Sequence, residues 1–214
     1  KAKRKRTLIY VGIGAGALLR CAVIVFVIVH SVQEQKRKEL AKEHETTTIH
    51  LVAGGDLNIS QMVVDSGGGN YDYGPMFLDV GHLLADADVS VLNFEGVLCA
   101  EPYGDSKSAP QSMVKALSRC GVDLLQMANS YSISRGLSGL ASSIDAIRTA
   151  GMEPLGVYAD ERAYKTGNGY TIQEVEGIKI AFVAFTKGMD GMTLPKGSEH
   201  SVNVLYSDYD STYQ

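Results

Sequence analysis

Polar residues that could take part in chemistry follow three short β-rich runs in the middle of the chain. They are Asp56, Asn93 with Glu95, and Asn129. Carboxylate and carboxamide oxygens are hard ligands that can bind a divalent cation, and a bound cation lowers the pKa of a coordinated water. The pattern therefore indicates a shared polar site, with metal-assisted hydrolysis of a phosphoester as the chemistry it could support.

A simpler interpretation exists for each of these residues taken singly. Asp and Asn at the ends of strands commonly cap a following helix or form an Asx-turn. The recurrence at three consecutive strand ends favours a common site over three separate turns.

The order of the elements predicts an α/β fold. Short strands are expected at 48–53, 89–92 and 123–127, and helices at 75–87, 110–119 and 136–150. Strands that alternate with helices form a parallel sheet, and ligands bind beyond the carboxyl ends of such strands. A hairpin is expected where 171–175 and 178–185 flank Glu176-Gly177, and the second of these strands could leave an uncovered edge.

The N-terminal region reads as a membrane anchor. Residues 1–7 are basic, 8–29 are apolar except for Arg20, and 30–47 form a charged linker that includes a helical stalk. A helix over 8–29 would rise about 33 Å, enough to cross a bilayer. A cleaved signal peptide is the alternative, although its apolar region is usually shorter. The positive-inside rule then predicts a single-pass protein with a cytoplasmic N-terminus and an extracytoplasmic globular part.

Composition excludes several classes of protein. The formal net charge is −4 and no basic field extends over the chain, so nucleic acid is not an expected partner. None of the three cysteines lies in a CxxC pair, which excludes a thiol-based metal site. Cys21 lies in the apolar run, and whether Cys99 and Cys120 pair is left open.

In this order, Gly55-Asp56, Asn93-Phe94-Glu95 and Ala128-Asn129 resemble the motifs of the CapA family of bacterial capsule-synthesis proteins. That family includes PgsA-type proteins of poly-γ-glutamate synthesis and has a metallophosphatase-like (calcineurin-like) fold. The resemblance covers residues 49–186. It implies partial metallophosphatase-like sheet-and-helix layers over 48–214, which would follow the transmembrane helix expected at 8–29. It also implies an incomplete site for Mn, Zn or Mg formed by Asp56, Asn93, Glu95 and Asn129.

The chain departs from the family pattern at several positions. Ser130 and Tyr131 stand where the family has Asn-His, and Ser134 stands where it often has Asp. A phenol is a poor metal ligand at neutral pH, so metal binding is expected to be weak and catalysis poor. His82, at an expected packing position in a helix, and His200 match no family ligand. The family's later His-containing motifs would follow Gln214, so only the N-terminal part of the domain is expected.

These residues imply one main function and two alternatives. The resemblance implies a membrane-anchored extracytoplasmic protein of capsule or poly-γ-glutamate biosynthesis or export, with an anionic polymer and membrane synthase subunits as partners. A metal-dependent phosphoesterase of the cell surface is the first alternative, and Ser130-Tyr131 argues against it. A non-catalytic interaction subunit is the second, favoured slightly by Arg20, because a charge within a membrane usually finds a partner. No catalytic residue is assigned.

Overall fold

The structure, a computed structural model, describes residue 20, residues 23–39 and residues 46–205. The chain divides into two compact units, Lys1–Thr48 and Ile49–Gln214. None of the helices in the described ranges combines the length and the apolar character that crossing a membrane requires. Most of the expected span at 8–29 lies outside the described residues, so the anchor stays a prediction.

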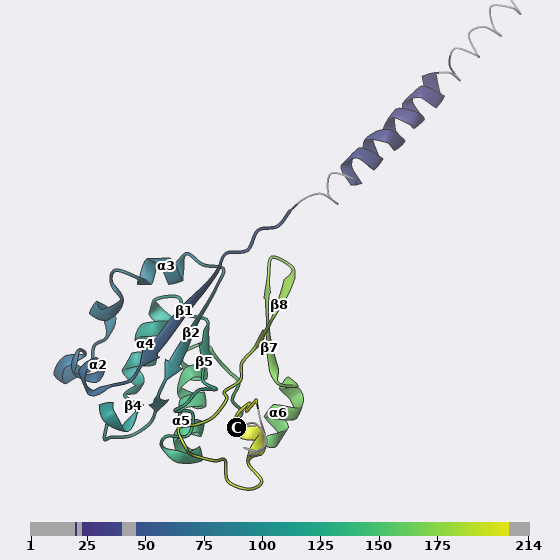
Figure 1. The fold of residues 1–214 in the computed structure, drawn as a ribbon. Coiled ribbons are helices and arrows are strands. Elements are labelled where there is room, and N and C mark those ends of the chain that lie inside the picture. The colour runs from purple at the N-terminus through teal and green to yellow at the C-terminus, as the bar shows by residue number, and fades with distance from the viewer. Residues whose placement is uncertain (1–19, 21–22, 40–45, 206–214) are drawn as a thin grey trace, which may run out of the picture. The chain divides into compact units, whose positions relative to one another are not determined.

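The first unit contains one described helix, over residues 23–39 (purple in Figure 1). Its first turns are apolar and exposed, because the side chains of 23–29 are between 49% and 70% accessible. Its later turns carry alternating charges, with an ion pair of 3.5 Å between Lys38 and Glu34 one turn apart. Such an exposed pair adds little stability. In the structure, residues 33–39 of the expected stalk are helical, and residues 40–45 lie outside the described residues.

The second unit is built on a four-stranded sheet with the order β1-β2-β5-β6. The strands are β1 (Leu51–Asn58), β2 (Val89–Glu95), β5 (Leu124–Gln126) and β6 (Glu153–Leu155). All three pairings are parallel, which confirms the α/β prediction. The sequence pattern does not predict β6, because this strand has only three residues and includes a proline.

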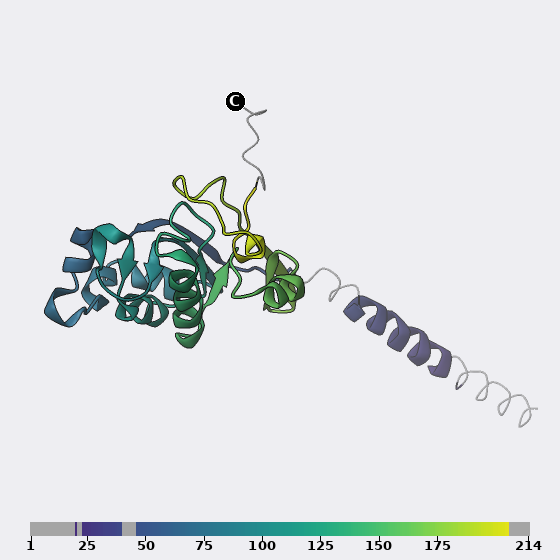
Figure 2. The ribbon, with the colours of Figure 1, turned by 90° about the horizontal axis from the view of Figure 1, so that it is seen from below.

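Two long helices, α4 (Gln111–Arg119) and α5 (Gly136–Thr149), lie on one face of this sheet (Figures 1 and 2). Their bounds agree with the predicted helices. Leu140, Ile144 and Ile147 follow the helical period along α5, and all three are buried. This stripe therefore faces the core that α5 shares with the sheet.

The strands that carry the polar residues extend further than the sequence predicted. β1 continues through Gly54-Gly55, where its register with β2 shifts by a bulge, and then includes Asp56. β2 likewise includes Asn93 and Glu95. A Cβ on Gly54 would lie 2.1 Å from the terminal Cδ2 of Leu92, so a larger residue at this bulge would require the Leu92 side chain to move.

The helix expected at 75–87 is wrong as one element. The segment is a 3₁₀ turn, η2 (Gly74–Phe77), followed by a separate short helix, α3 (Gly81–Ala85). His82 is exposed on α3 rather than packed, because the break changes which face is buried. The remaining short elements are α2 (Gln61–Asp65), η1 (Gly68–Asn70), β3 (Val97–Leu98), η3 (Gly104–Ser106), β4 (Ser108–Ala109), α6 (Glu161–Gly167) and η4 (Glu199–Ser201).

The predicted hairpin is confirmed as β7 (Tyr170–Val175) paired antiparallel with β8 (Ile178–Val183). Glu176 and Gly177 both have positive φ, the backbone that a tight two-residue hairpin turn requires. Among the described residues no third strand joins this pair, and Val183 is 62% exposed. The second strand, β8, therefore presents an uncovered edge, as expected.

Cys99 and Cys120 are both free and half-buried in the structure, so the disulfide that the sequence left open is not formed. The Cys99 thiol lies 3.2 Å from the hydroxyl of Ser108 on β4. Burial raises the pKa of the Cys120 thiol, which disfavours the reactive thiolate.

The buried stripe of α5 predicts a clear loss of stability. Leu140 is 2% exposed, so Leu140→Ala removes buried apolar surface and leaves a cavity, and should lower the free energy of unfolding by about 2–5 kcal/mol. Leu78→Ala is the matched control, because Leu78 is 76% exposed. Its effect should stay within about 0.5 kcal/mol. Urea unfolding of both variants measures the difference, and equal effects would contradict the packing of α5.

Candidate functional site

The register of the parallel sheet brings the predicted site residues to one face. Asp56 on β1 lies beside Asn93 on β2, and Asn93 lies beside Gln126 on β5. Two residues further along, and so on the same face, Asn58 lies beside Glu95. Side-by-side neighbours in a sheet project to the same face. The carboxyl-terminal ends of three strands therefore form one polar surface.

Hydrogen bonds join these side chains into an amide–carboxylate network, made of Asp56, Asn58, Asn93, Glu95 and Asn129. The Nδ2 group of Asn93 donates to Asp56 at 2.8 Å and to Glu95 at 3.5 Å. Asn129 follows β5 and donates to Oδ1 of Asn93 at 3.1 Å. The convergence of all four predicted residues is thus observed.

Asn129 has its amide orientation set by the backbone. Its Nδ2 donates to the carbonyl of Phe94 at 2.8 Å, and its Oδ1 accepts from the N–H of Tyr131 at 3.0 Å. A carbonyl can only accept and a backbone N–H can only donate, so the amide cannot be reversed. Because Asn129 then presents N–H to Asn93, Asn93 must present its own N–H to the carboxylates.

The other end of the network is oriented by a lysine. The Lys107 ammonium donates to Oδ1 of Asn58 at 2.9 Å and to the carbonyl of Ile59 at 3.1 Å. An ammonium has no acceptor, so Asn58 must turn its Nδ2 toward Glu95, which it reaches at 3.0 Å. Both carboxylates therefore receive N–H groups from amides.

Ser130 and Tyr131, the residues that depart from the family pattern, lie beside this network and are half-buried. The ring of Tyr131 packs under Lys107, with the ammonium nitrogen 4.4 Å from the ring centroid. This distance is within the range of a cation–π interaction. Tyr131 therefore contacts a cation through its ring face.

Two buried side-chain atoms have no hydrogen-bond partner among the described residues: Oε1 of Gln126, which lies beside Asn93, and the hydroxyl Oγ of Ser134. Gln126 uses its Nε2 to donate to the carbonyl of Ala128 at 2.9 Å. Ser134 occupies the position where the related family often has Asp. A buried polar atom without a hydrogen-bond partner lowers the stability of the fold, so apolar packing does not explain why a polar residue occupies either position.

The arrangement fits a divalent metal poorly. Asn93 turns its N–H group, and not its amide oxygen, toward the carboxylates of Asp56 and Glu95, so these oxygens do not converge on one point. Within the described ranges, no group of three or more His, Cys, Asp or Glu side chains is placed to bind a metal. As metal ligands, Asp56, Asn93, Glu95 and Asn129 stay a prediction.

Sequence reasoning missed three residues of this region: Asn58, Lys107 and Gln126. Asn58 could have been found by extending the strand expected at 48–53, since alternate residues of a strand share a face. Gln126 already lies within the strand expected at 123–127. Lys107 lies 49 residues from Asn58 in a loop with no motif, so only the fold places it here.

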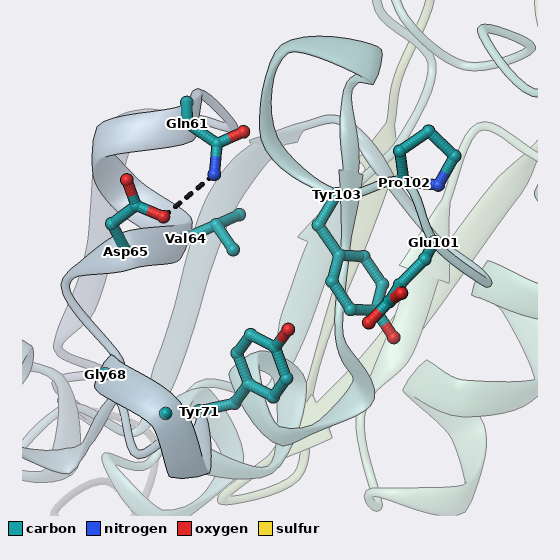
Figure 3. A pocket seen from close by; sticks show the side chains of 9 residues that line it. Gln61, Val64, Asp65, Gly68, Tyr71, Glu101, Pro102 and Tyr103 are labelled. Atoms are coloured by element: carbon teal, nitrogen blue, oxygen red, sulfur yellow. Dashed lines mark hydrogen bonds between the residues drawn. The ribbon is translucent and has the colours of Figure 1, made fainter.

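A separate open hollow of about 530 Å³ lies between α2 and the loop after β3 and contains no residue of the network. Tyr71 and Tyr103 face each other edge to face across it, with ring centroids 5.5 Å apart, beside Asp65 and Glu101 (Figure 3). Burial, and secondarily the charge of Glu101, raises the pKa of the Tyr103 phenol. The hollow is therefore aromatic and acidic.

The role of Asn129 predicts a loss of stability on truncation. Asn129→Ala leaves the N–H of Tyr131 without its acceptor and removes one of two donors to the Phe94 carbonyl, the other being the N–H of Gly96. The free energy of unfolding should therefore fall by about 1–3 kcal/mol. Asn70→Ala, at an exposed position, should change it by less than about 0.5 kcal/mol. Thermal and urea unfolding measure both. An Asn129→Ala variant as stable as the control would mean that the network does not organise this edge.

Comparison with known proteins agrees with the resemblance of the motifs. The sequence profile of a family described as "Bacterial capsule synthesis protein PGA_cap" matches residues 50–212, well over half of the chain. No curated protein matches the chain. The match includes every residue of the amide–carboxylate network as well as Lys107 and Tyr131. On this evidence the chain belongs to the family of bacterial capsule synthesis proteins.

Proposed function

We propose that this protein takes part in making or exporting a capsule polymer at the cell surface, and that a helix over 8–29 anchors it with residues 49–214 outside the membrane. Family membership supports the capsule role. The exposed apolar side chains of 23–29 support the anchor, because such a surface is expected to be covered by lipid or protein. The basic run at 1–7 supports a cytoplasmic N-terminus.

The amide–carboxylate network is the observation that carries a binding role. It lies at the carboxyl ends of parallel strands, where α/β sheets bind their ligands. Asp56 is exposed there and accepts from Asn93 through one oxygen. No described group donates to its second oxygen, which is therefore available to hydroxyl or amide N–H groups. A polysaccharide supplies hydroxyl groups and poly-γ-glutamate supplies amide N–H groups, so the site suits contact with a capsule polymer.

The two alternatives receive less support. A metal-dependent phosphoesterase needs oxygen ligands that converge on a cation, whereas Asn93 presents an N–H group to the carboxylates of Asp56 and Glu95. A non-catalytic subunit of a membrane synthase is compatible with the proposed role, and Arg20 would contact the partner. Co-purification with a membrane synthase in mild detergent would identify such a complex.

A complementation experiment tests the polymer role. In a strain that lacks the gene, Asp56→Ala should restore several-fold less surface-bound polymer than the wild type, because it removes the exposed acceptor. Asp79→Ala, a change of the same type at another exposed position, should restore a normal amount. Hydrolysis of the cell-bound polymer, followed by analysis of glutamate and sugars, measures the amount and identifies the class. Equal polymer from both variants would refute a role of Asp56 in handling it.

Protease treatment of intact cells tests the proposed topology. An external protease should degrade the unit at 49–214, since the proposal places it outside the membrane. An epitope tag ahead of residue 1 should stay protected until the cells are lysed. Immunoblots against the tag and the globular unit report both, and a globular unit that is protected before lysis would reverse the topology.

A further inference from the structure

The backbone around Lys107 is held in a specific and unfavourable conformation. Its φ is +62°, the left-handed region that residues with a Cβ rarely adopt. Its N–H donates to the carbonyl of Gly104 at 2.8 Å, and its own carbonyl accepts from Val97 at 2.7 Å. Such backbones persist where the surrounding structure requires them, often at functional sites. Here the conformation directs the long side chain of Lys107 to the end of β1.

The ammonium of Lys107 has a complete set of partners there. It donates to Oδ1 of Asn58 and to the carbonyl of Ile59, and its third side faces the ring of Tyr131. Two oxygens and an aromatic face match the three N–H donors of an ammonium group. The group is half-buried, so these contacts hold it in place rather than leaving it in solvent.

Lys107 is also the cation that balances the acidic network. Asn58 connects it directly to Glu95, and Asn93 connects Glu95 to Asp56. In the described part of the chain, no other lysine or arginine forms a hydrogen bond or ion pair with a member of the network. The carboxylates are thus linked to one positive charge through amide groups.

We propose that the Lys107 ammonium is the resident cation of this site and takes the place of the divalent metal that the family resemblance implies. Lys107 supplies positive charge at the end of β1, and the ring face of Tyr131 covers the ammonium where the family has an imidazole. The amide of Asn58 connects the ammonium to Glu95, and the amide of Asn93 connects Glu95 to Asp56. The site therefore works without a metal ion. This proposal does not depend on which polymer the protein handles.

The first test is titration of the purified full chain with Mn²⁺, followed by the electron paramagnetic resonance signal of the free ion. No saturable binding at one ion per chain is expected up to millimolar Mn²⁺. Saturable binding of one Mn²⁺ per wild-type chain, lost in Asp56→Asn, would overturn the proposal. This test needs no variant at position 107, so it decides even if such variants do not fold.

The second test compares Lys107→Met with Lys115→Met, two changes that remove the same charge. Lys115 is exposed on α4, whereas Lys107 binds the network, so Lys107→Met should lower Tm by about 4–8 °C and the control by less than about 2 °C. Millimolar Mn²⁺ should then raise the Tm of Lys107→Met but not that of the wild type, because the vacated position would accept another cation. Equal Tm values for the two variants, or no Mn²⁺ effect on Lys107→Met, would overturn the proposal. Both measurements are independent of capsule production, so their failure is distinguishable from failure of the polymer role.

Discussion

The hydrogen bonds between the side chain of Asn129 and the backbone determine how the whole polar edge is arranged. The Phe94 carbonyl can only accept a hydrogen bond and the Tyr131 N–H can only donate one, so the amide of Asn129 has a single orientation. Asn129 is 6% exposed, so water competes poorly for these bonds. The amide orientation of Asn93 follows from this one, whereas Lys107 sets that of Asn58. An asparagine at this position therefore transmits the geometry of β2 and of the loop after β5 to the carboxylates.

The network has a different character from a metal centre built of the same residue types. In a metal centre, amide and carboxylate oxygens point at a common ion, whereas here amide N–H groups point at the carboxylates and an ammonium binds the remaining amide oxygen. The replacement of Asn-His by Ser130-Tyr131 agrees with this difference, because the Tyr131 ring packs against Lys107 instead of offering a nitrogen.

Several features could be predicted before the fold was known. Parallel strands end at a common edge, so Asp56, Asn93, Glu95 and Asn129 were expected to converge, and they do. The helix at 136–150 followed from its apolar period. The helix expected at 75–87 was wrong, because the segment is two short turns with a break between them, and each turn buries one large apolar side chain, Phe77 and Leu84. Local periodicity cannot detect such a break when tertiary contacts decide it.

What the amino-acid sequence determined by itself was the alternation of strands and helices, the tight hairpin at Glu176-Gly177 and the residue types at the strand ends, because these depend on local periodicity and local backbone preference. The tertiary structure alone decided that Asn58 joins the site through a bulged strand, which way each amide faces, and that Lys107 reaches Asn58 from a distant loop. The direction of a hydrogen bond depends on partners that come together only when the chain folds. A contact between residues far apart in the sequence leaves no local sequence pattern from which it could be predicted.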